Sequence, residues 1–219
     1  MKRIQELEIM DDREQAAAYA KADFSSSNQM FVDRLIDTYP DRLGSILDIG
    51  CGPADVAIRI LRAVPSAKVT AVDASSPMVE IGKKAVREAG FQDNIDVVLG
   101  RLPGITLGDM QFQTIASKDL LHHLPDPSIF WEEVVELATA TTAIYVMDLY
   151  RPESREDARK IVESVSGNEP EVLKKDFYNS LLAAFTVDEI QDKLESACLP
   201  LSVEKVSERH LLIHGLLSV

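Results

Sequence analysis

The chain has 219 residues, of which 46% are hydrophobic and 27% are charged, as in an ordinary globular protein of one domain. The formal net charge of −13 argues against a nucleic acid as the main partner, because binding to phosphates requires a basic surface. The sequence has neither a signal-peptide core nor an apolar run long enough to span a bilayer, so we expect a cytoplasmic location and no membrane partner. Cys51 and Cys198 belong to no cluster with zinc-ligand spacing, so no metal site and no structural disulfide are predicted.

Residues 1–44 are predicted to form an N-terminal helical segment. Residues 1–10 are charged, and we expect them to fray. An alanine-rich pattern predicts a helix over 11–23, and the polar residues 25–28 begin a second helix that Pro40 ends. Tyr19 and Phe24 precede the first strand, where they either fold over a bound ligand or pack in the core.

From residue 45 onward, short apolar strands alternate with amphipathic helices. Strands are predicted at 45–49, 67–72, 95–99, 112–117 and 142–149. Helices are predicted at 54–64, from Ser75 or Ser76 to Gly90, and from Asp126 onward. This alternation predicts a parallel sheet with helices on both faces.

The C-terminal third departs from this pattern. Residues 151–185 are too many for a bare connection, and we expect a helical lid over the ligand crevice. Thr186 and Glu189 form a capping box that opens a helix reaching about residue 197. Extended runs at 201–206 and 210–216 predict a hairpin, so the last strand should run antiparallel to its neighbours.

The first strand leads into a glycine turn, and the second ends in a carboxylate. Gly50 and Gly52 allow backbone N–H groups to approach a ligand that a Cβ would block, and the next helix directs its positive end at the same place. Asp73 lies 23 residues beyond Gly50, where a carboxylate can accept hydrogen bonds from both hydroxyls of a ribose. Together these features predict a nucleoside-containing cofactor.

The same turn limits the choice of cofactor. Asp55 stands where a dinucleotide-binding turn has its third small residue, which disfavours a nicotinamide-dependent reductase, and no phosphate-binding P-loop is present. Asp48 at the end of the first strand would repel a pyrophosphate but attract a cationic group. The residues therefore favour a nucleoside that carries a positive charge.

Three segments carry a resemblance to a known family. LDIGCGPAD at 47–55, VTAVDASSPM at 69–78 and SKDLLHHLPDP at 117–127, followed by the terminal hairpin, resemble the class I S-adenosylmethionine-dependent methyltransferases. The resemblance implies an α/β fold with a doubly wound, mostly parallel seven-stranded sheet, Rossmann-like, whose last strand is antiparallel. It also implies a methyltransferase domain over 45–219 with the lid inserted at about 151–185.

The resemblance also implies the roles of individual residues. Asp48, Gly50 and Gly52 would hold the methionine part of the cofactor, and Asp73 would hold the ribose hydroxyls. The neighbours of the adenine would be Ala74, Met78, Gly100, Arg101 and Leu102. Ser117, with Lys118 beside it, would line the floor near the sulfonium. The chain departs from the family pattern at Ala54, at Arg101 and at residues 138–141, where the family often has a glycine, an aspartate and a Pro-Gly-Gly turn.

Candidates for contact with the methyl acceptor lie in the N-terminal segment, in the loop after the fourth strand and in the predicted lid. His122 is either a general base or a structural histidine, and for His123 the structural interpretation is favoured. Tyr19, His123, Phe177 and Tyr178 are the candidate substrate contacts.

These observations predict methyl transfer from S-adenosyl-L-methionine to a small or medium-sized acceptor, with S-adenosyl-L-homocysteine as product. Two alternatives remain open at this point: a non-catalytic S-adenosylmethionine-binding regulatory protein and a protein methyltransferase.

Overall fold

The computed structural model describes residues 1–6 and 11–217, in which seven strands form one sheet in the order β3-β2-β1-β4-β5-β7-β6. The strands are β1 Ser45–Ile49, β2 Lys68–Asp73, β3 Ile95–Leu99, β4 Thr114–Lys118, β5 Ala143–Leu149, β6 Ser202–Lys205 and β7 His210–Leu216. The pairs among β1 to β5 are parallel, whereas β7 runs antiparallel to both β5 and β6. The predicted fold class, including the reversed last strand, is therefore confirmed.

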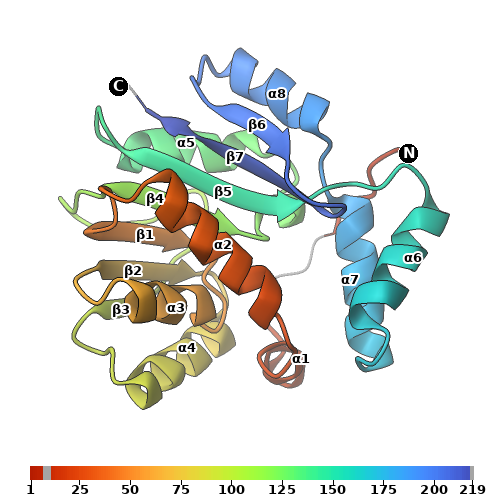
Figure 1. The fold of residues 1–219 in the computed structure, drawn as a ribbon, viewed down its shortest axis with the longest axis horizontal. Coiled ribbons are helices and arrows are strands. Elements are labelled where there is room, and N and C mark those ends of the chain that lie inside the picture. Colours follow the sequence, from red (N-terminus) through yellow and green to blue (C-terminus); the bar gives the residue numbers. More distant parts are fainter. Residues whose placement is uncertain (7–10, 218–219) are drawn as a thin grey trace.

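Helices cover both faces of this sheet (Figure 1). One face packs against α2 (Ser25–Thr38), α3 (Asp55–Ala63) and α4 (Ser76–Ala89), and the other packs against α5 (Ser128–Leu137) and α8 (Val187–Ser196). Each helix contributes an apolar stripe, so two buried clusters sandwich the strands. In the part of the chain that the structure describes, no helix combines the length and the apolar character needed to cross a membrane.

Local sequence explains where the elements near the glycine turn begin and end. The Ser75 hydroxyl accepts a hydrogen bond from the Met78 N–H and so caps α4, and Gly90 ends this helix with φ of 78°. The predicted capping box at the start of α8 is also confirmed, with both of its hydrogen bonds formed between Thr186 and Glu189.

A second group of helices lies toward the carboxyl ends of the parallel strands. It comprises α1 (Arg13–Tyr19), the short 3₁₀ helix η1 (Leu121–His123), α6 (Arg155–Ser166) and α7 (Glu171–Ala183), of which α6 and α7 lie on the right in Figure 1. Helices α6 and α7 form the segment predicted as a lid. They share a separate buried cluster with Leu149, the last residue of β5. The crevice at the strand ends is thus bounded by helices as well as by loops.

The expectation that residues 1–10 fray is wrong for residues 1–6, and residues 7–10 lie outside the described part. The Arg3 guanidinium donates hydrogen bonds to the carbonyl oxygens of His122, Leu124 and Pro125 at 3.0, 2.8 and 3.1 Å. The Ile4 N–H donates to the Leu182 carbonyl at 3.0 Å. A guanidinium can donate to several backbone carbonyls that have no partner within a helix or strand. These hydrogen bonds hold residues 1–6 against η1 and α7.

Candidate active site

The glycine turn after β1 is anchored to the end of β2. Gly50 and Gly52 have φ of 78° and 52°, and a Cβ added at Gly50 would lie 3.1 Å from three Leu120 atoms. The N–H groups of Gly50 and Cys51 both donate to the Val72 carbonyl, at 2.8 and 3.0 Å. Gly50 and Gly52 thus adopt the left-handed conformation, which glycine reaches without strain. The turn that they form brings the start of α3 against the end of β2.

Asp73 is the carboxylate at that end of β2. Its Oδ2 accepts a hydrogen bond from the Gly52 N–H at 2.7 Å, and its Oδ1 accepts one from the Ser75 N–H at 2.9 Å. Burial raises the pKa of Asp73, although these backbone N–H groups act in the opposite direction. Each carboxylate oxygen has a further lone pair, so a fixed Asp73 can still accept hydrogen bonds from a ligand.

Asp48 lies behind the turn and is 1% exposed. Burial and the nearby charge of Asp73 raise its pKa to about 7, while Lys118 acts in the opposite direction. Within the described residues, its Oδ2 atom has no hydrogen-bond partner. A buried carboxylate in this state gains from a cation or a donor brought by a ligand.

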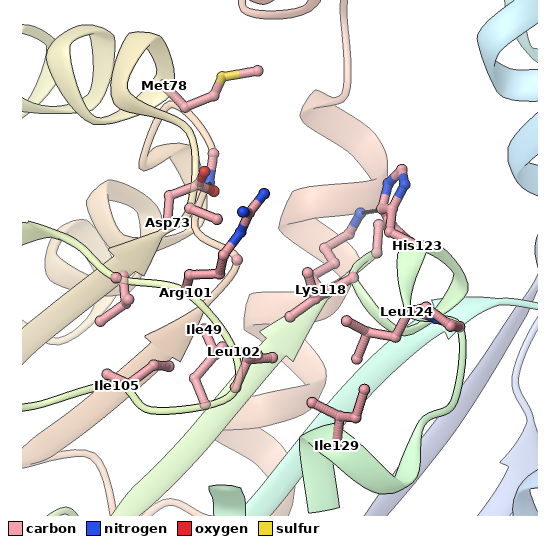
Figure 2. Close-up of a pocket in the computed structure, with 18 of the residues that line it drawn as sticks. Ile49, Asp73, Met78, Arg101, Leu102, Ile105, Lys118, His123, Leu124 and Ile129 are labelled. Atoms are coloured by element: carbon pink, nitrogen blue, oxygen red, sulfur yellow. Dashed lines mark hydrogen bonds and ion pairs between the residues drawn. The ribbon is translucent and has the colours of Figure 1, made fainter. Parts of the chain in front are cut away.

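A cavity of about 500 Å³, here called the main cavity, opens at the carboxyl ends of β1, β2 and β4. Figure 2 shows Met78, Asp73 and Arg101 on one side of it and Lys118 and His123 on the other. The predicted cofactor residues that line it are Gly50, Gly52, Asp73, Ala74, Met78, Gly100, Arg101 and Leu102. Ile49, Val72, Ile105 and Ile129 make much of its wall apolar, as in pockets that bind small organic molecules.

Two smaller hollows adjoin the main cavity. The turn pocket, of about 290 Å³, contains Asn28, Asp48 and Asp55. The α7 pocket, of about 170 Å³, contains His122, Phe177 and Arg209. Tyr19 and Asp119 line all three spaces and therefore lie where they meet.

Ser117 and Tyr178 are not brought to these spaces, contrary to the expectations for them. Ser117 is fully buried, and its hydroxyl donates to the Ile49 carbonyl at 2.7 Å inside the sheet. Side chains alternate along a strand, so Lys118 rather than Ser117 reaches the cavity. Tyr178 packs with the α6–α7 cluster, because neighbouring residues of a helix point about 100° apart and Phe177 takes the pocket-facing direction.

Sequence reasoning missed Asp119, which follows β4 with φ of 56°. Burial tends to raise its pKa, but the ion pair with Lys118 and the nearby His210 lower it to about 2. Its Oδ1 has no hydrogen-bond partner among the described residues. Aspartate tolerates the left-handed conformation better than most residues. The sequence could have indicated Asp119 as a site residue, because it is an acidic residue directly after an apolar strand.

His122 pairs with Asp148, a second residue that sequence reasoning missed. The His122 Nδ1 atom lies 2.7 Å from Asp148 Oδ1, and both side chains are 3% exposed. Burial lowers the pKa of His122, but the charge and hydrogen bond of Asp148 outweigh it and the pKa is raised. The pKa of His123 is lowered well below its usual value by burial and by the charge of His122. His122 lines only the α7 pocket, whereas His123 lines both that pocket and the main cavity.

Glu133 on α5 holds the loop that carries Arg101 and Leu102. Its carboxylate accepts hydrogen bonds from the N–H groups of Gly104 and Ile105 at 2.6 and 2.7 Å, and the residue is 3% exposed. We expect Glu133→Ala to lower the free energy of unfolding by about 2–3 kcal/mol, because the buried Ile105 N–H and the partly buried Gly104 N–H lose their acceptor. Urea unfolding measures this, with Glu132→Ala on the exposed side of α5 as the matched control. Equal unfolding curves for the two variants would contradict the proposed support.

Comparison with known proteins finds similarity to methyltransferases. A family model described as a methyltransferase domain matches residues 46–141, which begin in β1 and end just before β5. The chain is 28% identical over 111 residues to the demethylmenaquinone methyltransferase of Porphyromonas gingivalis, covering 50% of this chain and 45% of that protein. It is 31% identical over 100 residues to the malonyl-[acyl-carrier protein] O-methyltransferase of Priestia megaterium, covering 46% of this chain and 34% of that protein. The chain thus spans less than half the length of these relatives.

Solved structures share the fold over almost the whole chain. A putative S-adenosyl-L-methionine-dependent methyltransferase from Methanococcus maripaludis superposes with a TM-score of 0.76 at 18% identity, covering 99% of this chain and 98% of that one. A SAM-dependent methyltransferase from Aquifex aeolicus gives a TM-score of 0.69 at 19% identity, covering 94% and 98%. The matched domain, the relatives and the shared fold, with the glycine turn and Asp73 at the strand ends, confirm the predicted resemblance to the class I S-adenosylmethionine-dependent methyltransferases.

Proposed function

We propose that this protein binds S-adenosylmethionine in the main cavity and transfers its methyl group to a small or medium-sized acceptor. The observation that carries the proposal is the pair of carboxylates, Asp48 and Asp73, beside the glycine turn. Asp73 is oriented to accept ribose hydroxyls, and Asp48 is a buried acid that gains from a cation. A positively charged nucleoside satisfies both, whereas a pyrophosphate would be repelled.

The proposed placement follows the chemistry of the three spaces. The adenosine occupies the main cavity, where Met78, Leu102 and Ile105 provide apolar contacts. The methionine end reaches the turn pocket with its amino group toward Asp48. The acceptor enters the α7 pocket, so the two ligands meet at Tyr19 and Asp119, under the helices proposed as a lid.

S-adenosylmethionine supplies a methyl group already activated on a positively charged sulfur. The task of the protein is then to align the acceptor and exclude water, and proximity and orientation carry much of the rate. For a hydroxyl or amine acceptor, we propose that His122 Nε2 takes the proton while Asp148 stabilises the imidazolium. The new bond forms from the acceptor atom to carbon as the sulfur–carbon bond breaks, leaving S-adenosylhomocysteine. A thiolate or carboxylate acceptor needs no base.

The name of one relative, a demethylmenaquinone methyltransferase, favours a small-molecule acceptor. The net charge of −13 supports the same choice over a nucleic acid. A cytoplasmic location stays a prediction.

The test is binding of S-adenosylmethionine by calorimetry at pH 5.5 and pH 7. Because the pKa of Asp48 is about 7, the acid must lose a proton before it attracts the cationic end, so we expect affinity to rise about tenfold between these values. Asp48→Asn removes the titrating group and should bind weakly with little pH dependence. Failure of the wild-type protein to bind S-adenosylmethionine and S-adenosylhomocysteine at either pH would overturn the proposed function. Transfer of a labelled methyl group to small molecules from a cell extract, compared with its protein fraction, then identifies the acceptor class.

A further inference from the structure

Three side chains suited to metal binding meet between the N-terminal segment and η1. Glu6, His122 and His123 each offer one ligand atom, and these atoms lie within 4.8 Å of one another. Glu6 is more than a hundred positions from the histidines, so no spacing motif reveals the cluster in the sequence. Two imidazoles and one carboxylate are a common ligand set of catalytic zinc sites.

The residues behind these ligands hold them as in known metal sites. Asp148 engages His122 Nδ1 at 2.7 Å, which leaves Nε2 as the ring nitrogen available for an ion. A metal-bound histidine almost always has such a carboxylate or carbonyl on its second nitrogen. The Ser180 hydroxyl likewise donates to Glu6 Oε2 at 2.8 Å and so orients that carboxylate.

His123 supplies an independent observation. Its ring centroid lies 4.1 Å from that of His122, and within the described residues its buried Nδ1 has no hydrogen-bond partner. Two imidazoles at this distance cannot both be positively charged without repulsion, which favours at least one neutral ring. A neutral imidazole is the form that binds a metal.

We propose that Glu6, His122 and His123 form a three-ligand site for a divalent transition metal ion such as Zn²⁺, with an open position toward the α7 pocket. His122 and His123 both line that pocket, and so does Ser180. Zinc ligands lie about 2.0–2.2 Å from the ion and therefore about 3.4 Å apart in a tetrahedral site, so binding draws this cluster together by roughly 1 Å. A metal ion and a proton compete for the lone pair of His122 Nε2, so binding of one prevents binding of the other.

The site goes beyond the proposed function, and its test needs no methyl transfer. Chelator-treated protein comprising residues 1–219 is titrated with Zn²⁺ by calorimetry and with Co²⁺ by visible absorption, which reports the geometry of the ligands. We expect one equivalent to bind to the wild-type chain, and at least tenfold weaker binding for Glu6→Gln and for His123→Ala. Asp148→Asn should weaken binding about 10–100-fold through His122.

The matched control is His214→Ala, since His214 lies 3.8 Å from Glu204 and forms with it another His–carboxylate pair, nearer the surface. Its binding should equal that of the wild type. The proposal is overturned if the wild-type chain binds neither ion, if Glu6→Gln binds as tightly as the wild type, or if binding is lost in His214→Ala. Glu6→Gln is nearly isosteric, and a circular dichroism melt of each metal-free variant separates ligand loss from unfolding.

Discussion

Replacement of Asp73 by alanine is expected to weaken the binding of S-adenosylmethionine by roughly 100-fold or more. The expected loss is about 3 kcal/mol, because two hydrogen bonds from ribose hydroxyls to a charged acceptor disappear in a mostly buried site. The substitution also leaves the N–H groups of Gly52 and Ser75 without their acceptor, so the glycine turn loses its anchor to β2. Calorimetry with S-adenosylmethionine and S-adenosylhomocysteine measures the effect.

Two further variants separate ligand contacts from folding. Asp73→Asn keeps one acceptor oxygen and the shape of the side chain, so we expect an intermediate loss of affinity. Asp96→Ala removes an exposed carboxylate from the neighbouring strand β3 and should bind like the wild type. An Asp73→Ala protein that is folded and binds within threefold of the wild type would remove the proposed ribose contact.

Replacement of His122 by alanine is expected to lower kcat for a hydroxyl or amine acceptor by about 10²–10⁴-fold, the usual contribution of a general base. The dissociation constant of the cofactor should stay nearly unchanged, because His122 lines the α7 pocket and not the main cavity. The measurement is initial rate against acceptor concentration, with cofactor binding measured separately. His214→Ala, which changes a histidine outside these spaces, is the control. Equal kcat values for His122→Ala and the wild type would show that His122 does not take the proton of the acceptor.

The pH profile tests the same role through Asp148. A base must be unprotonated, so the wild-type rate should rise with pH through the pKa of His122, which lies above its usual 6.5. Burial alone lowers that pKa, and Asp148 raises it. Asp148→Asn should therefore move the rise in rate to lower pH. Ring resonances of His122 followed by NMR report the same shift without an acceptor.

The sheet could be predicted from local sequence because each element carries its own signal. The structure gives β1, β3 and β7 the predicted bounds, and the capping box at Thr186 begins α8. Apolar runs, capping residues and turns act over a few positions, so they are visible without the fold. Strand ends were less well predicted. The fourth strand, predicted at 112–117, forms at Thr114–Lys118, and this places Lys118 rather than Ser117 at the cavity.

The residues of the candidate site also differ in whether local sequence reveals them. Gly50, Gly52 and Asp73 belong to short motifs, and the sequence predicted that they would meet. Asp148 lies inside an apolar strand, and Glu133 lies on a helix stripe, so their roles depend on which residues the fold brings opposite them. The N-terminal segment is the extreme case. The contacts of Arg3 lie more than a hundred residues away along the chain, and its charged sequence suggested only solvent exposure.

The position of β7 has a consequence for how the chain folds during synthesis. This strand inserts between β5 and β6, and it pairs with β5 along all seven residues of that strand. Every residue of β5 is buried in the finished sheet, so until residues 210–216 leave the ribosome, β5 has an apolar open edge. Such an edge readily pairs with strands of other chains. Nascent chains that stall before this point, or fragments cut near residue 200, should therefore be the species that aggregate and recruit chaperones.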